Sequence, residues 1–92
     1  MQAKFKKIGN RWYAFPKSDA HPEELKRMIL ETGIINSIED LESPDKLVLN
    51  AQTDAGVVTI VMDDDGLEIR IQSENTLPSG EKILEKLEKK PN

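Results

Sequence analysis

The central part of the chain alternates between apolar and polar residues with the two-residue period of a β-strand. Three alternating runs are separated by two short turns that each end in a glycine: 47–53, 57–62 and 67–72. In the third run one face is apolar throughout: Leu67, Ile69 and Ile71. The pattern predicts a three-stranded antiparallel meander over residues 46–72.

Folding these runs back on one another also predicts their register. The first hairpin pairs Leu47 with Met62, Leu49 with Ile60, and Ala51 with Val58. The second pairs Val58 with Ile71, Ile60 with Ile69, and Met62 with Leu67. This register makes one face wholly apolar, and a slip by one residue would bury charged side chains. The register is therefore strongly specified.

Residues 1–17 are predicted to form a basic, aromatic β-hairpin around a Gly9-Asn10 turn. All four aromatic residues of the chain lie between Phe5 and Phe15, and aromatic side chains favour strands. Pro16 ends the second strand because it has no backbone N–H to donate.

Two amphipathic helices are predicted, over 18–33 and 79–90. The first has an apolar stripe, Ser18 or Asp19 as a cap, Pro22 in its first turn and Gly33 as its stop. Ser79 caps the second, after a polar loop over 73–78. The two stripes consist of Leu25, Met28, Ile29 and Thr32 in the first helix and Ile83, Leu84 and Leu87 in the second.

Residues 34–46 are the least regular part of the chain. Ser37 followed by Asp40 is typical of a helix start, so we expect a short helical turn over 37–42. The predicted order is ββα(turn)βββα, and the fold class is α+β. We expect a single two-layer domain over 1–92, in which the N-terminal hairpin and the meander form an antiparallel sheet of five strands, or of three plus two, and both helices pack on one face.

Charge is unevenly distributed along the 92 residues. Residues 1–18 carry a charge of +5, residues 19–80 carry −10, and the remainder carries +1. The chain has no cysteine, which excludes disulfides and thiolate metal ligands. No apolar run approaches the ~20 residues of a membrane helix, and no apolar segment follows the basic N-terminus. We expect a cytoplasmic protein that does not bind membranes.

Few residues offer catalytic or metal chemistry. Asp63, Asp64 and Asp65 are adjacent, whereas a calcium loop spaces its ligands so that they converge, and the following Gly66 suits a hairpin turn. His21 is the only histidine and precedes Pro22 at an exposed helix start. The sequence contains no nucleophile elbow and no phosphate-binding glycine loop. We therefore expect a protein that is not an enzyme and uses no metal or cofactor.

The N-terminal hairpin is the first candidate binding surface. Alternation places Trp12 on one face and Arg11, Tyr13 and Phe15 on the other. Either the aromatic residues fill the core and the lysines protect an edge strand, or, if Tyr13 and Phe15 pack inward, Trp12 faces outward as an anchor. On the second interpretation the partner-binding residues are Trp12, Arg11, Lys4 and Lys6.

The second face of the meander is another candidate interface. Its rows mix β-branched apolar residues with polar ones. Two explanations are open: β-branched residues are favoured in strands for their propensity, or they form an interface with a partner or, in a homodimer, with a second copy of the chain. The residues concerned are Val48, Val57, Thr59 and Val61.

These features predict a small protein-binding module, a regulator or inhibitor that occupies a partner's surface. The alternative is a DNA-binding regulator that uses the basic hairpin. The stretches 7–10 and 15–17 resemble the opening of the AbrB/MazE family, and Val57 to Ile71 is similar to its closing strands. That resemblance implies a DNA-binding, antitoxin-like dimer. The spacing from Gly9 to Pro16 and the length of 33–57 depart from the family pattern, so no residue roles are transferred.

Overall fold

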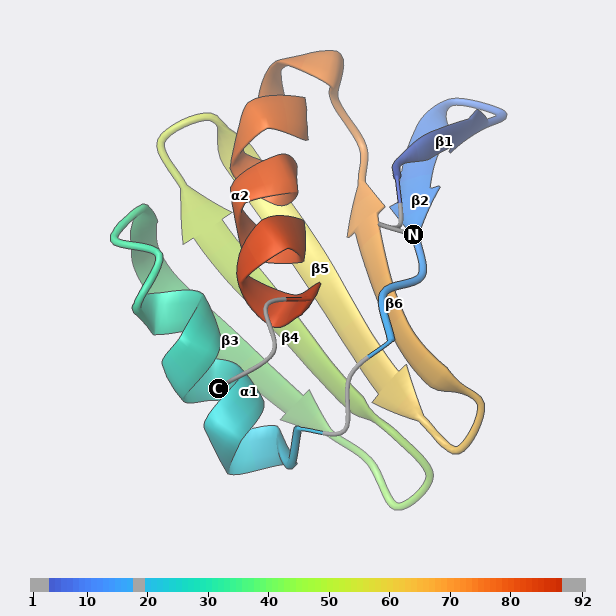
Figure 1. The fold of residues 1–92 in the computed structure, drawn as a ribbon, viewed down its shortest axis with the longest axis vertical. Helices are drawn as coiled ribbons and strands as arrows, with labels where there is room; N and C mark the ends of the chain where they lie inside the picture. Colours follow the sequence, from blue (N-terminus) through green and yellow to red (C-terminus); the bar gives the residue numbers. More distant parts are fainter. Residues whose placement is uncertain (1–3, 18–19, 89–92) are drawn as a thin grey trace.

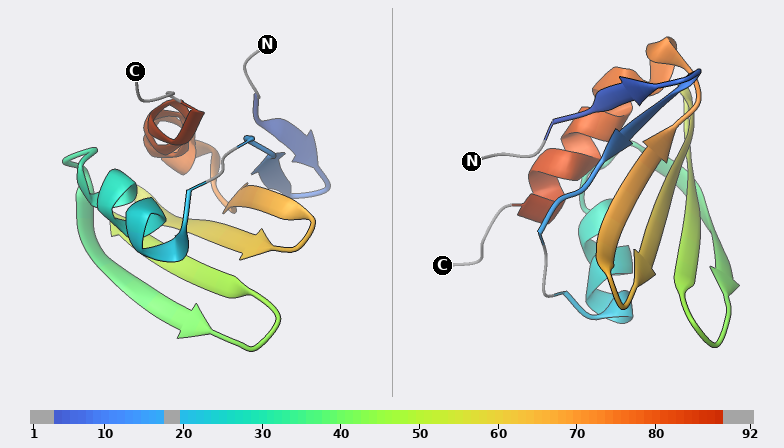
Figure 2. Two further views of the ribbon diagram at one scale, coloured as in Figure 1. Left: turned by 60° about the horizontal axis from the view of Figure 1, so that its bottom comes forward. Right: turned by 90° about the vertical axis from the view of Figure 1, so that its right-hand side faces the viewer.

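The computed structural model describes residues 4–17 and 20–88. They form one six-stranded antiparallel sheet with two helices on the same face (Figures 1 and 2). Spatial order across the sheet is β1-β2-β6-β5-β4-β3. The elements in chain order are β1 (Lys6–Ile8), β2 (Arg11–Ala14), α1 (Pro22–Leu30), β3 (Ile35–Glu42), β4 (Leu47–Thr53), β5 (Gly56–Asp63), β6 (Gly66–Ile71), the 3₁₀ turn η1 (Glu74–Thr76) and α2 (Leu77–Glu88). The α+β fold with helices on one side is confirmed.

The predicted meander and its register are confirmed. Strands β4, β5 and β6 pair with the register expected from the sequence, from Leu47 opposite Met62 to Val58 opposite Ile71. Their alternating apolar residues face the helices and are buried together with one face of each helix. The core consists of Ala14, Leu25, Ile29, Leu47, Leu49, Ala51, Val58, Ile60, Leu67, Ile69, Ile71, Ile83, Leu84 and Leu87.

The N-terminal hairpin belongs to the same sheet. β1 and β2 meet at the predicted Gly9-Asn10 turn, where Gly9 has a φ of 65°, and β2 pairs with β6. Trp12 lies opposite Ile71, and Ala14 lies opposite Ile69. Residues paired across adjacent strands point to the same face of a sheet. Ile69 and Ile71 point into the core beneath the helices, so Trp12 also faces the helices.

The helical turn expected over residues 37–42 is wrong. Residues 35–42 form β3, an edge strand paired with β4. Ile35 and Ile38 are three residues apart, as on a helix, yet both face the helices because a β-bulge shifts the register between Ile35 and Ser37. The bulge thus gives a strand the apolar spacing of a helical turn, and the element order is ββαββββα.

Both helices differ from their expected limits at the N-terminal end. α1 begins at Pro22 with exposed His21 as its N-cap residue, and the expected caps, Ser18 and Asp19, lie outside the described residues. α2 begins at Leu77 rather than Ser79, because η1 runs directly into it. Part of the expected loop over 73–78 is therefore helical. None of the helices described is long and apolar enough to span a membrane.

Candidate protein-binding groove

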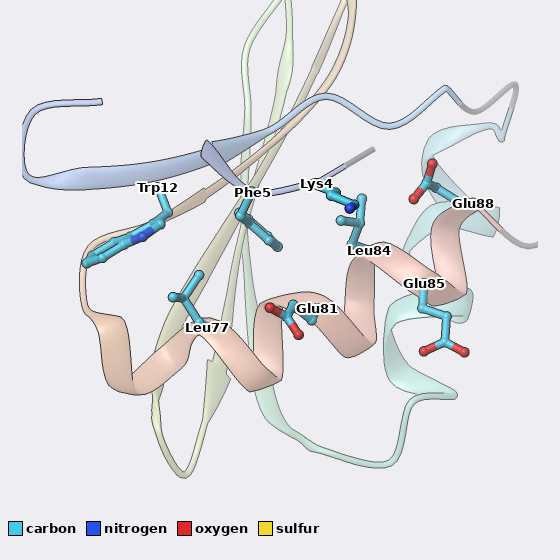
Figure 3. A pocket seen from close by; sticks show the side chains of 8 residues that line it. All are labelled: Lys4, Phe5, Trp12, Leu77, Glu81, Leu84, Glu85 and Glu88. Atoms are coloured by element: carbon cyan, nitrogen blue, oxygen red, sulfur yellow. The ribbon is translucent and has the colours of Figure 1, made fainter. Parts of the chain in front are cut away.

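A groove of about 620 Å³ lies between the N-terminal hairpin and helix α2 (Figure 3). The hairpin side presents two aromatic rings, those of Phe5 and Trp12. Both rings are half-buried and pack against the core, so each keeps an accessible part. The full lining is Lys4, Phe5, Trp12, Leu77, Glu81, Leu84, Glu85 and Glu88.

The spacing of residues along α2 produces the other wall. Leu77, Glu81, Leu84 and Glu88 recur at intervals of three and four, so they line one side of the helix. Leu84 is buried and anchors this side to the sheet, whereas Glu81 is exposed at the opening of the groove. The wall therefore combines an apolar base with an acidic rim.

Gly80 brings α2 close to the hairpin. It is buried, and a Cβ placed on it would lie 3.0 Å from Phe5 Cζ and overlap the end of Ile71. Such a separation is below ordinary van der Waals contact, so the helix and the Phe5 ring approach this closely only because the residue is glycine. Gly80 thereby sets the width of the groove beside Phe5.

Charge in the groove is predominantly negative. Glu81, Glu85 and Glu88 line it together with a single ammonium group, that of Lys4. Within the described part of the chain, Glu81 and Glu85 form no ion pair. They are four residues apart, an arrangement in which like charges repel. A bound cation would relieve this repulsion.

Trp12 also carries a cation in the folded protein. Lys7 lies opposite Trp12 in the β1–β2 register, and its Nζ is 5.2 Å from the centroid of the ring. This distance is typical of a cation–π contact, in which the negative face of the indole attracts an ammonium group. The ring is thus able to hold a positive charge.

The four residues predicted to bind a partner fall on two faces of the sheet. Trp12 and Lys4 line the groove, whereas Lys6 and Arg11 share the opposite face with Tyr13. The outward placement of Trp12 was expected only if Tyr13 and Phe15 pack inward. Phe15 remains 57% exposed, so that condition does not hold, and Trp12 lies on the face that carries the helices.

Two parts of the groove went unnoticed in the sequence. Phe5 was expected to belong to the core or the hairpin, but not to line a groove together with Trp12. The sequence did contain a pattern that indicates an acidic side of α2, because Glu81, Glu85 and Glu88 recur at helical spacing. Their role as a wall depends on how α2 lies over β6, which no local pattern specifies.

The second predicted interface lies on the face that carries no helix, hereafter the open face. Val48, Val57, Thr59 and Val61 are all on it, as the register requires. Their exposure differs: Val57 is 37% exposed, whereas Val61 is only 6% exposed because neighbouring side chains surround it. Thr59 donates a hydrogen bond to Asn50 Oδ1 at 2.8 Å, and Asn50 Nδ2 donates to Glu39 Oε1 at 3.4 Å. On the open face of β5, polar Thr59 therefore lies between Val57 and Val61.

The acidic turn between β5 and β6 is exposed, and the side chain of Asp63 forms a hydrogen bond with its backbone. Asp63 Oδ1 accepts a hydrogen bond from the backbone N–H of Asp65 at 2.8 Å, which stabilises the turn locally. Across the residues described, no three acidic or histidine side chains gather in an arrangement that could hold a metal ion.

Comparison with known proteins gives no match: no family model, no curated protein and no solved structure is significantly similar to the chain. The evidence for function is therefore the shape and chemistry of the molecule itself. Among the described residues, the groove brings two accessible aromatic rings together with the carboxylates of Glu81 and Glu85, which form no ion pair there.

Proposed function

We propose that the protein is a non-enzymatic protein-binding module, a regulator or inhibitor that occupies a surface of its partner with the groove between the hairpin and α2. The observation that supports this function is the pair of half-buried rings, Phe5 and Trp12, in a cavity of about 620 Å³. Tryptophan is enriched among the residues that dominate binding energy, particularly where it lies in a pocket. A groove held between a sheet and a helix is also preorganised, which lowers the entropic cost of binding.

The test is capture of partners from nuclease-treated cell lysate by the tagged protein. Trp12→Ala is expected to weaken capture by about thirty-fold or more, the effect of an interface residue worth ~2 kcal/mol. Because alanine would also loosen packing against the core, Trp12→Phe provides a milder variant that keeps an aromatic ring. Tyr13→Phe is the matched control on the same strand, on the open face.

Selective loss with both Trp12 variants, but not with Tyr13→Phe, supports the proposal, provided that all three variants melt cooperatively. Equal capture by the wild-type protein and a folded Trp12→Phe variant, with no loss in Trp12→Ala, would contradict it. Crosslinking followed by mass spectrometry then maps the captured partner to residues of α2 or elsewhere.

A second candidate function is binding of single-stranded nucleic acid on the open face. Phe15 is 57% exposed, and Tyr13 lies beside it on the same face together with Lys6 and Arg11. Aromatic side chains flanked by basic ones can stack on bases while the cations contact phosphates. Binding of a labelled oligonucleotide should then weaken steeply with salt and be lost in Phe15→Ala. Capture that vanishes on nuclease treatment would favour this function over the first.

A further inference from the structure

The rim of the groove favours a positively charged occupant. Glu81 and Glu85 lie on successive turns of α2 and form no ion pair within the described residues. A wholly apolar or anionic occupant would remove water from these carboxylates without replacing it by a partner, which is costly. A cation would instead form charge-assisted hydrogen bonds with them.

The indole of Trp12 favours the same chemistry. Lys7 Nζ lies 5.2 Å from the ring centroid, so the ring already attracts an ammonium group. Lys7 itself is exposed and does not line the groove. Its contact with Trp12 can therefore be exchanged for a contact with a cation from outside at little cost to the fold.

We infer that the groove recognises a basic segment of a partner protein. One arginine or lysine side chain of that segment lies against Trp12, and further basic side chains reach the carboxylates of Glu81 and Glu85 along α2 (Figure 3). Lys7 competes with it for the indole in the free protein. This inference rests on the proposed function and adds to it the chemistry of the partner and the presence of an internal competitor.

The first experiment uses a hexa-arginine peptide as the probe and a hexa-citrulline peptide as its uncharged isostere. Trp12 is the single tryptophan of the chain, so fluorescence excited selectively at tryptophan, without a contribution from Tyr13, reports on the groove. Hexa-arginine is expected to shift or quench the emission with saturation, and hexa-citrulline to leave it unchanged. Saturation of binding in calorimetry without any change in Trp12 emission would overturn the inference.

Matched charge variants separate the groove from the general acidity of the protein. Glu81→Gln/Glu85→Gln removes two charges from the rim, whereas Asp64→Asn/Asp65→Asn removes two from the β5–β6 turn, outside the groove. The first pair should weaken hexa-arginine binding about five- to tenfold. The second should weaken it less than twofold at physiological salt, because distant charges are screened. Equal effects of the two pairs would mean non-specific attraction and would overturn the inference.

The competitor is tested by a pair of lysine variants. Lys7→Gln should tighten hexa-arginine binding about two- to fivefold, which corresponds to the loss of an exposed cation–π contact. Lys6→Gln removes the same charge one residue away, on the opposite face of the hairpin, and should change the affinity less. If both variants tighten binding equally, Lys7 does not compete at the indole.

The outcome for the captured partner distinguishes the two proposals. A partner whose capture depends on Trp12 but is unaffected by Glu81→Gln/Glu85→Gln leaves the proposed function standing and refutes the basic segment. A partner whose capture is independent of Trp12 refutes the proposed function itself, whatever hexa-arginine does.

Discussion

Gly80 of α2 lies directly against Ile71 of β6, so closely that a Cβ on the glycine would overlap Cδ1 of the isoleucine. Ile71 is fully buried, and Phe5 Cζ also lies close to the same Cβ position of the glycine. The absence of a Cβ at Gly80 lets α2 lie close both to β6 and to Phe5, which lines the groove. The packing of α2 on the sheet and the shape of the groove therefore depend on the same residue, which has no side chain.

Gly80→Ala is expected to destabilise the protein in spite of alanine's better helix propensity. The gain of ~1 kcal/mol in propensity is set against overpacking, which costs about 1–3 kcal/mol, so the unfolding free energy should fall by up to roughly 2 kcal/mol. Urea denaturation measures the change. Ile71→Val removes the overlapping methyl group, and the double variant should be more stable than the sum of the two single effects predicts. Strict additivity would show that Gly80 and Ile71 are not coupled.

Thr76 connects η1 to the β4–β5 turn. Its side chain is buried, and Oγ1 donates a hydrogen bond to the carbonyl oxygen of Ala55 at 2.8 Å. Thr76→Val keeps the shape but leaves that carbonyl without this donor, so we expect a loss of about 1–3 kcal/mol. Thr59→Val on the open face, where the hydroxyl bonds to Asn50, is the control and should cost less because solvent can replace the bond. Equal losses in thermal denaturation would contradict this ranking.

Lys26 of α1 forms an ion pair with Asp40 of β3, the edge strand. Both side chains are partly exposed, so the pair should contribute only ~0.5 kcal/mol. A double-mutant cycle with Lys26→Ala and Asp40→Ala measures this coupling, and it should shrink in 1 M salt. A coupling energy that is large and independent of salt would mean that the pair is effectively buried.

The valines of the open face should differ in their contribution to stability. Val61→Ala is expected to cost about 1–2 kcal/mol because Val61 is 6% exposed, whereas Val57→Ala should cost less than ~0.5 kcal/mol. Chemical denaturation at two protein concentrations makes the comparison. A large, concentration-dependent effect of Val57→Ala would instead indicate that the open face is covered by a second copy of the chain.

Local patterns were sufficient where they were periodic and bounded by clear turns. Alternation over residues 47–72 fixed three strands, their register and the apolar face, because any slip would have buried charge. The stripes of the two helices also identified the side on which each packs. These are short-range properties, and they can be recognised in the sequence without knowledge of any long-range contact.

Long-range contacts decided the rest. β3 was mistaken for a helical turn because its bulge is compatible with a three-residue apolar spacing, and only pairing with β4 identifies it as a strand. The face on which Trp12 lies depends on the pairing of β2 with β6, which are more than fifty residues apart. The groove exists because α2 returns across that joined sheet and approaches Phe5 at Gly80. The sequence alone thus determined the strands of the hairpin and the meander, the two helices and the apolar face of the meander, but not β3. Tertiary structure determined which side chains face one another across the groove. That arrangement depends on how α2 packs beside the N-terminal hairpin, and no local sequence pattern specifies this packing.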